Sequence, residues 1–233
     1  MSEQDEHKKA AAEKALELVR DGMLLGLGSG STANYFTEGL GQLVKEGLKV
    51  RGVPTSRATA NLAAANGIPI VTELVGQIDL TVDGADEVDQ ALNLVKGRGG
   101  ALFREKLVAA ASKRFVVVID ESKVVKKLGA GVLPVEVSGF LWRTTAHRLA
   151  SLATSLTLRG GEETPYITDN GNLILDLTLA NGIENSPALA AELSAIVGVV
   201  EHGLFIGMTD TCIVAGPDGP LVVGRQSGAA ASL

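Results

Sequence analysis

Short apolar runs alternate with helical segments through the first half of the chain, and this alternation limits the possible folds more than any other feature. Runs that predict buried strands lie at Met23–Leu27, Leu48–Val53, Ile68–Val71, Ile78–Val82 and Phe115–Ile119. Segments with helical periodicity surround them, at Glu6–Val19, Ala33–Val44, Ala58–Asn66 and Leu102–Ala111. Strands that alternate with helices pair in parallel. We therefore expect an α/β fold built on a Rossmann-like, doubly wound, mostly parallel sheet.

The pattern changes after Gly129. A strand at Val132–Val137 and a helix at Trp142–Thr157 are followed by strands at Pro165–Thr168 and Leu173–Leu179, which a turn at Asp169-Asn170-Gly171-Asn172 would join as a hairpin. A helix at Ala188–Ile196 and a strand at Val199–Phe205 complete the series. Strand, helix, hairpin, helix and strand, in this order, predict a small ferredoxin-like α+β unit.

Two further strands, at Cys212–Ala215 and Leu221–Val223, are expected to return to the first sheet. We therefore predict a Rossmann-like domain at residues 1–129 and 207–233, and a second, smaller ferredoxin-like domain at residues 130–206.

Two turns rich in glycine or hydroxyl residues follow the first two strands. The first, GLGSGST, spans Gly26–Thr32 and leads into a helix, an arrangement that binds phosphate through helix N-terminal amides. The second places Thr55, Ser56 and Thr59 at another helix start. The first turn lacks the spacing of a dinucleotide-binding fingerprint and the lysine of a Walker A loop. An ordinary strand-to-helix turn with a hydroxyl N-cap is the alternative.

The segment Asp83–Lys106, DGADEVDQALNLVKGRGGALFREK, concentrates most of the expected chemistry. Its candidate chemical groups are Asp83, Asp86, Lys96, a glycine-rich turn and Glu105. The strand before it would place these groups in the crevice at the carboxyl ends of the sheet strands, where such folds bind ligands. The glycine turns would hold phosphate, and the acidic groups could bind sugar hydroxyls and transfer a proton.

Metal coordination is the rival use of the acidic loop, because hard cations bind carboxylate oxygens. Asp83, Asp86 and Glu87 are the candidate ligands. Lys96 and Arg98 would compete with a cation, and the three histidines are far apart in the sequence. We therefore predict a metal-free site.

Composition excludes several other classes of protein. The net charge of −6 and the lack of a basic face argue against nucleic-acid binding. A single cysteine, Cys212, allows no intramolecular disulfide and fits a reducing compartment. The N-terminus lacks an apolar signal core, and no apolar run reaches the roughly 18 residues of a membrane span. We expect a cytoplasmic protein without a membrane partner.

Taken in order, these motifs resemble ribose-5-phosphate isomerase of the A type. The matching segments are GLGSGST, DGADEVD, VKGRGGALFREK, LPVEV and TDNGNLILD, and the resemblance runs from the N-terminal helix to about Gly219. It implies an aldose–ketose isomerase that interconverts ribose 5-phosphate and ribulose 5-phosphate, in the non-oxidative branch of the pentose phosphate pathway, without a metal or organic cofactor. It also implies a homodimer or homotetramer of two-domain subunits.

The resemblance assigns roles to particular residues. Glu105 matches the family's general base, with Asp83 and Lys96 as further catalytic candidates. The substrate-binding positions it implies are Ser29, Gly30, Ser31, Thr32, Asp83, Gly84, Ala85, Asp86, Lys96, Gly97, Arg98, Gly99 and Lys123.

The residue types suit this chemistry. Aldose and ketose interconvert when a carboxylate moves a proton between C2 and C1 through an enediolate, and Lys96 is the first candidate to stabilise its oxyanion. Asp83 could instead handle hydroxyl protons during ring opening. Asp83 and Asp86 would raise the pKa of Glu105 by repulsion and Lys96 would lower it, so the net direction is open.

Arg98 departs from the run of glycines that is common in the family. It could add a fork for phosphate or point to solvent. Two alternatives to the isomerase are an enzyme for another sugar phosphate and a non-catalytic sugar-phosphate sensor. The presence of Glu105 favours the isomerase.

Overall fold

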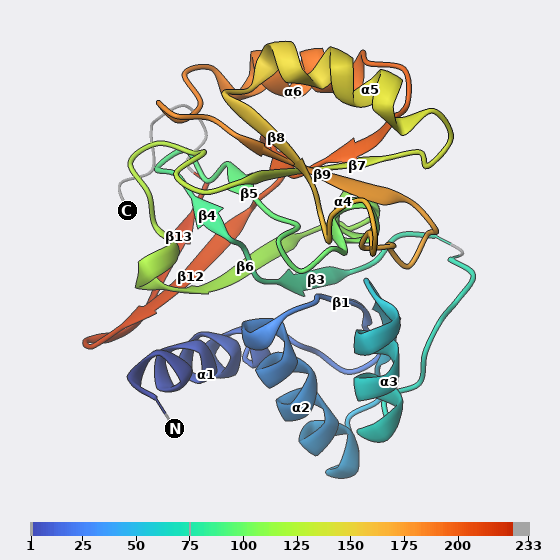
Figure 1. Cartoon of the computed structure of the whole chain (residues 1–233). Coiled ribbons are helices and arrows are strands. Elements are labelled where there is room, and N and C mark those ends of the chain that lie inside the picture. Colours follow the sequence, from blue (N-terminus) through green and yellow to red (C-terminus); the bar gives the residue numbers. More distant parts are fainter. Residues whose placement is uncertain (1, 75, 226–233) are drawn as a thin grey trace.

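The computed structural model describes residues 2–74 and 76–225, and its centre is a six-stranded sheet (Figure 1). The strand order is β13-β12-β6-β3-β1-β2. Adjacent strands from β12 to β2 are parallel, and β13 is antiparallel to β12. The strands are β1 (Leu24–Leu27), β2 (Arg51–Pro54), β3 (Leu80–Asp83), β6 (Phe115–Asp120), β12 (Thr211–Gly216) and β13 (Gly219–Gly224). The expected Rossmann-like, mostly parallel sheet is confirmed.

Helices cover both faces of this sheet. Below it in Figure 1 lie α1 (Glu3–Leu16), α2 (Ser31–Lys45) and α3 (Arg57–Ala65), while α4 (Leu102–Ala110) lies above it. Alanines of α1 and the apolar face of α2 pack on the aliphatic strand residues in one core cluster. Strands buried on both faces are continuous apolar runs, which explains why the sequence marked them clearly.

The residues after β6 build a four-stranded antiparallel sheet with the strand order β10-β7-β9-β8. Its elements are β7 (Leu133–Val137), α5 (Trp142–Leu149), η2 (Ala150–Leu152), β8 (Ser155–Leu158), β9 (Leu173–Thr178), α6 (Ser186–Ser194) and β10 (Val199–His202). Helices α5 and α6 cover its outer face (Figure 1). This order is that of a ferredoxin-like unit. The domain boundaries at residues 129/130 and 206/207 stay a prediction, and residues 226–233 of the first expected domain lie outside the described residues.

A small third sheet joins the two units. It has the order β11-β5-β4 and consists of β4 (Glu87–Val88), β5 (Leu94–Val95) and β11 (Leu204–Phe205). The β4–β5 hairpin is stabilised by Asp89, whose carboxylate accepts from the amides of Ala91 and Asn93. Strands of two residues have no detectable periodicity, so this sheet was not predicted. It places Lys96 directly after β5.

Three sequence-based elements were wrong. Ile68–Val71 forms only a single bridge, from Ile70 to Gly52, because Pro69 has no amide to donate. The helix expected at Trp142–Thr157 ends at Leu149, and its last residues form β8 instead. Pro165–Thr168 forms a single bridge, from Ile167 to Leu173, rather than a strand.

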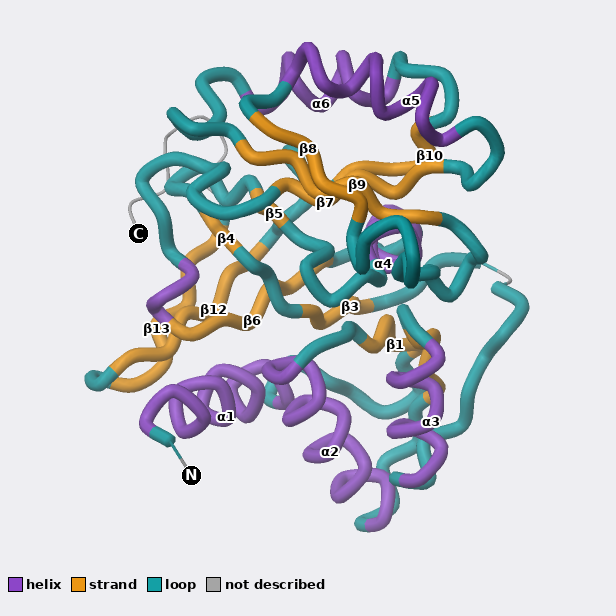
Figure 2. Tube along the Cα trace, in the orientation of Figure 1, coloured by secondary structure: helices purple, strands orange, loops and turns teal. Residues whose placement is uncertain are grey.

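As a result, β9 pairs with β8, and the Asp169–Asn172 turn lies within a long loop between them. Figure 2 shows this loop beside α4. Two smaller differences are that the second strand begins at Arg51, and that Val199–Phe205 divides into β10 and β11. Over residues 2–74 and 76–225, the helices are too short or too polar to cross a bilayer.

Candidate active site

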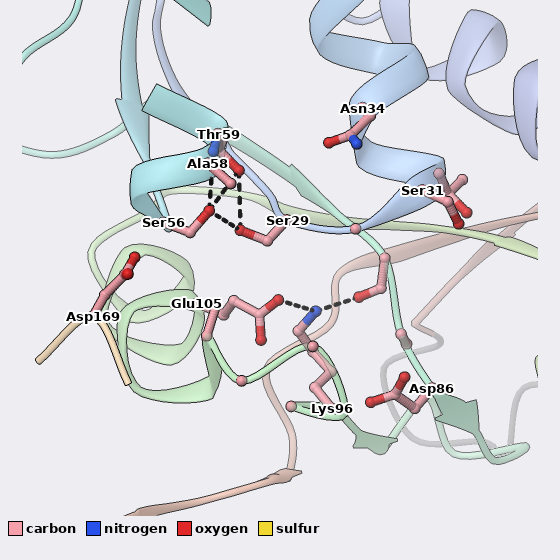
Figure 3. Close-up of a pocket in the computed structure, with 18 of the residues that line it drawn as sticks. Ser29, Ser31, Asn34, Ser56, Ala58, Thr59, Asp86, Lys96, Glu105 and Asp169 are labelled. Carbon is pink, nitrogen blue, oxygen red and sulfur yellow. Dashed lines mark hydrogen bonds and ion pairs between the residues drawn. The ribbon is translucent and has the colours of Figure 1, made fainter. Parts of the chain in front are cut away.

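A cavity of about 460 Å³ lies beyond the carboxyl ends of β1, β2 and β3, bordered by the first turns of α2, α3 and α4 (Figure 3). Every residue predicted for the site lines it except Asp83 and Arg98. The predicted residues that line it are Ser29, Gly30, Ser31, Thr32, Gly84, Ala85, Asp86, Lys96, Gly97, Gly99, Glu105 and Lys123. Segments far apart in the chain therefore meet here because parallel strands all end at one edge of the sheet.

A buried ion cluster of Lys96, Glu105 and Asp83 forms the floor of the cavity. Lys96 Nζ lies 3.3 Å from Glu105 Oε1 and 3.2 Å from Asp83 Oδ2, and it donates to the carbonyl oxygen of Gly84. The side chains are 3%, 6% and 0% exposed, respectively, so water screens their interactions very little. Figure 3 shows the Lys96 ammonium between Glu105 and the loop after β3.

Asp83 lies beneath the glycine-rich turn Gly26–Thr32 and does not line the cavity. Its Oδ1 accepts from the amides of Ser29 at 3.0 Å and Gly84 at 2.8 Å. A Cβ on Gly28 would lie 2.5 Å from Asp83 Cα, so this close approach of two chain segments requires glycine. Asp83 therefore fixes the loop and Lys96 together, and contact of its carboxylate with a ligand is not part of this geometry.

Glu105 stands in the first turn of α4, and its buried Oε2 has no hydrogen-bond partner among the described residues. Burial raises the pKa of Glu105 to about 8; Lys96 opposes this shift, and Asp83 and Asp86 add to it by repulsion. Burial also raises the pKa of Asp83. The carboxylates outweigh burial at Lys96 and raise its pKa to about 12. The direction left open by the sequence is thus upward for Glu105.

The residue after Glu105 attaches α4 to the ferredoxin-like unit. Lys106 Nζ donates to Glu201 Oε1 and to the carbonyl oxygen of His202, both at 2.6 Å. His202 is buried, and burial together with the Lys106 charge lowers its pKa to about 4, so it is neutral near pH 7. Glu105 is therefore on a helix turn that is fixed from both sides.

Three hydroxyl groups at the start of α3 contact the hydroxyl of Ser29 in the glycine-rich turn after β1. Ser29 Oγ lies 2.8 Å from both Thr55 Oγ1 and Ser56 Oγ, and 3.0 Å from Thr59 Oγ1. Ser56 is also the N-cap of α3, because its hydroxyl accepts from the amide of Thr59. The Ser29 hydroxyl is thus occupied by this cluster, and its neighbours Gly30, Ser31 and Thr32 lie nearer the start of α2.

One end of the cavity suits an anion. Ser31 and Thr32 form the first turn of α2, which contains no acidic residue, and Gly30 before them has a φ of 102°. Lys8 of α1 and Lys123, in the short helix η1 (Glu121–Lys123), also line the cavity. Free helix amides, hydroxyls and two ammonium groups are the combination that binds phosphate.

Several lining residues were not predicted. They are Lys8, Asn34, Ser56, Ala58, Thr59, Gly100, Ala101, Tyr166 and Asp169. The hydroxyls at the start of α3 had been recognised as a group, and their proximity to the parallel strand ends could have placed them here. Tyr166 and Asp169 come from the β8–β9 loop of the other unit; the sequence marked Asp169 only as part of a turn, and no local pattern marks Tyr166. Asp169 accepts from the amide of Arg57 at 2.7 Å, so this loop caps α3.

The Arg98 side chain pairs with a buried acid instead of lining the cavity, and 34% of it stays exposed. Its guanidinium lies 2.5 Å from the buried carboxylate of Glu87, while its amide donates to Asp86 Oδ2 at 2.9 Å. Glu87 also accepts from the amides of Gly129 and Gly131, both at 2.7 Å. The arginine therefore completes the shell of a buried acid at the junction between the two units.

The three carboxylates considered as metal ligands diverge. Asp83 points to Lys96, Asp86 accepts from the Arg98 amide, and Glu87 points to the residue 129–131 segment. Within the described part of the chain, no three His, Cys, Asp or Glu side chains gather as metal ligands.

We predict that Arg98→Met lowers the free energy of unfolding by roughly 1–3 kcal/mol, because Glu87 would lose its charged partner while staying buried. Denaturant titration measures this. Arg143→Met is the matched control, since Arg143 forms an exposed pair with Glu162, a type that contributes at most about 1 kcal/mol. Equal stability losses in the two variants would contradict the assignment. Affinity for inorganic phosphate should not change in either variant.

Comparison with known proteins agrees with this geometry. The family model described as ribose 5-phosphate isomerase A (phosphoriboisomerase A) matches residues 51–219. Ribose-5-phosphate isomerase A 1 of Oceanobacillus iheyensis is 49% identical over 220 residues, which are 94% of this chain and 98% of that protein. Ribose-5-phosphate isomerase A of Agrobacterium fabrum is 50% identical over 219 residues, 91% of this chain and 94% of that protein.

A solved structure extends the similarity to the whole fold. It is a D-ribose-5-phosphate isomerase in complex with phospho-erythronic acid, with a TM-score of 0.91 and 40% sequence identity. The match covers 97% of this chain and 100% of that one.

Proposed function

The chain belongs to the ribose 5-phosphate isomerase A family, and on this premise we propose that it interconverts ribose 5-phosphate and ribulose 5-phosphate with Glu105 as the base. The observation that supports this most directly is the buried contact of Glu105 with Lys96 at the floor of the cavity. A carboxylate with a raised pKa beside a fixed cation is suited to proton transfer next to a carbonyl group.

The two ends of the cavity define how the open-chain substrate would lie. The phosphate would bind at the start of α2, between Lys8 and Lys123, where Ser31 and Thr32 also line the cavity. The carbonyl end would then reach Glu105 and Lys96. Asp169 and Tyr166 close the cavity beyond this end. The solved relative is in complex with a phosphorylated acid, phospho-erythronic acid.

The reaction needs one base and one stabilising charge. Glu105 would remove the C2 proton of the aldose, and the electron pair would form an enediolate whose oxyanion lies against the Lys96 ammonium. Glu105 would return the same proton to C1 while the hydroxyl proton moves from O2 to O1, and this gives the ketose. Asp83 would act from beneath, because it holds Lys96 in place and keeps it charged. Asp86 lines the cavity and would accept from a sugar hydroxyl.

The pH dependence of kcat/KM should report Glu105. Only its carboxylate can accept a proton, and burial raises the pKa of Glu105 to about 8. The value of kcat/KM should therefore rise with pH, reach half of its maximum near pH 8 and level off about one unit above it, since this ratio reports the free enzyme. The substrate phosphate loses its second proton near pH 6, so its titration is separate. A profile between pH 6 and 9.5 measures this limb. A flat profile over that range would contradict the assignment.

Ketose formation from ribose 5-phosphate in the presence of excess chelator tests the proposed activity. We expect turnover that chelator does not change. Binding of ribose 5-phosphate without turnover would instead indicate a sensor. Turnover that chelator abolishes would mean that a cation takes part in the reaction. A panel of hexose and amino-sugar phosphates separates the pentose isomerase from an enzyme for another sugar phosphate.

We also propose that the protein is a cytoplasmic homodimer or homotetramer. Support for association comes from large apolar side chains on the ferredoxin-like unit, where Phe140, Leu141 and Val197 are 81%, 63% and 80% exposed. Such side chains are common at contacts between subunits. Light scattering after size-exclusion chromatography measures the mass, and a monomer at micromolar concentration would contradict this proposal.

A further inference from the structure

We propose that Arg159, which belongs to the ferredoxin-like unit, is a positioning residue for the isomerisation. It would orient the glycine-rich turn Lys96–Gly100 at the carbonyl end of the cavity. This inference rests on the proposed function, because it concerns the geometry in which the enediolate forms. Arg159 is outside the cavity lining and outside every motif that the sequence marked.

The Arg159 guanidinium donates four hydrogen bonds, two to a carboxylate and two to the turn. On one side, Nε and Nη2 donate to the two carboxylate oxygens of Asp176, at 2.9 and 2.5 Å. On the other side, Nη1 donates to the carbonyl oxygens of Gly97 at 3.1 Å and Arg98 at 3.0 Å. The Arg159 and Asp176 side chains are 16% and 17% exposed, so the pair is largely shielded from water. This planar fork is a geometry that lysine cannot reproduce.

The strands explain why the fork is rigid. Arg159 directly follows β8, and its amide donates to the carbonyl oxygen of Ile174 at 2.9 Å, which continues the pairing with β9. In this register Thr157 is opposite Asp176, so Arg159 and Asp176 are diagonal neighbours on one face of the sheet. The alternate residues Leu156, Leu158, Leu175 and Leu177 belong to or pack against the core of this unit.

Three successive carbonyl groups of the turn face the second unit. Those of Gly97 and Arg98 accept from Arg159, and the carbonyl oxygen of Gly99 lies 3.5 Å from the Tyr166 hydroxyl. The Arg159 guanidinium lies 5.8 Å from the Tyr166 ring centroid, so the two side chains that contact the turn also lie next to each other. A Cβ on Gly100 would lie 2.2 Å from the Tyr166 hydroxyl, so the loop packs closely on the turn.

Because a peptide bond is planar, the direction of each carbonyl group also fixes the direction of the following amide. In a trans peptide the N–H points opposite to the preceding carbonyl. Because the Gly97 carbonyl faces Arg159, the Arg98 amide points away and donates to Asp86. Because the Arg98 carbonyl also faces Arg159, the Gly99 amide points away from it as well, and no acceptor for this amide is found in the described part of the chain. Gly99 lines the cavity.

We therefore assign to Arg159 the task of presenting the Gly99 amide as a donor to the substrate oxygen at the carbonyl end. Fixed donors of this kind stabilise a developing oxyanion, and a shift of about 1 Å can lower a rate about 100-fold. Lys96 is the first residue of this turn and is held separately, because its amide donates to the carbonyl oxygen of Gly203 and its ammonium group contacts Asp83.

The test compares Arg159→Lys with the wild type, using two ligands that report the two ends of the cavity. Calorimetry measures binding of phospho-erythronic acid, which reaches the carbonyl end, and of inorganic phosphate, which does not. We expect Arg159→Lys to weaken phospho-erythronic acid about tenfold, leave phosphate affinity unchanged, and lower kcat about 10- to 100-fold with a smaller change in KM. The pH at which kcat/KM rises should not change, because the groups around Glu105 are unchanged.

Arg143→Lys is the matched control, because Arg143 forms an exposed pair with Glu162 in the same unit. It should leave both affinities and kcat unchanged. If Arg159→Lys does not fold, Asp176→Asn decides, since it loosens the same fork and should show the same difference between the two ligands. Wild-type values in these variants, or an equal loss of both ligands, would overturn the proposal. If the wild type binds both ligands without turnover, the proposed function fails, and the two affinities alone decide the role of Arg159.

Discussion

Glu105→Gln is expected to lower kcat for ribose 5-phosphate by about 10³- to 10⁴-fold, at the upper end for acid–base groups, because one carboxylate both removes and returns the proton. The amide has nearly the same shape but cannot accept a proton at any working pH. KM should change only a few-fold, since the phosphate end of the cavity is formed by other residues. Ketose formation, followed under saturating substrate, measures this effect.

Stability separates a chemical effect from a folding effect in this variant. Glu105 is buried, and its Oε2 has no hydrogen-bond partner among the described residues. Replacing it with a neutral amide removes a buried ionisable group, while Lys96 keeps Asp83 as a partner. We therefore expect no loss of thermal stability. Glu38→Gln, on the exposed face of α2, is the matched control and should keep full activity. Near-normal turnover of Glu105→Gln would exclude this residue as the base.

Lys96→Met is expected to lower turnover strongly and also to destabilise the fold. The ammonium group lies between two buried carboxylates, 3.2 Å from Asp83 and 3.3 Å from Glu105. Removing one partner from a buried ion cluster typically costs about 3–5 kcal/mol, because the remaining charge is left uncompensated. The oxyanion would also lose its nearest cation, so kcat should fall by at least about 10²-fold. Denaturant titration and steady-state kinetics measure the two effects.

Lys113→Met provides the surface counterpart of this change. Lys113 lies 2.8 Å from Asp79, but its side chain is 58% exposed, and such pairs contribute at most about 1 kcal/mol. A stability loss in Lys96→Met no larger than in Lys113→Met would contradict a buried ion cluster. Residual turnover of Lys96→Met should shift to higher pH, because Lys96 is the group that holds the Glu105 pKa down.

Much of the fold and part of the candidate site could be predicted from local patterns. Apolar runs such as Phe115–Ile119 are buried on both faces, so every residue of the run is apolar and the strand can be recognised without knowing its neighbours in the sheet. One stretch contains Asp83, Lys96 and Glu105, and α2 begins at Ser31, two residues before the helix that the sequence predicted. Their meeting followed from the parallel order of the strands.

Other features depended on contacts between distant residues. The residues Ser155–Leu158 continue a helical pattern, yet they form β8, because β9 offers a pairing partner that periodicity cannot show. Arg98 looked like a phosphate ligand until the fold placed Glu87 beside it. Lys8 and Tyr166 line the cavity although no local motif marks them, and Asp169 lines it from a turn that the sequence did not connect with the site.

By itself, the sequence determined the parallel sheet, the positions of the glycine turns and the candidates for acid–base residues, because backbone conformation and side-chain chemistry are properties of short segments. Only the tertiary structure decided the state of these groups. It buried Glu105 and thereby raised the pKa of this residue, and it placed Asp83 beneath Lys96 instead of in the cavity. It also brought Arg159 of the ferredoxin-like unit into contact with the Lys96–Gly100 turn. Burial and long-range hydrogen bonds arise when separate elements pack together, and no short segment contains that information.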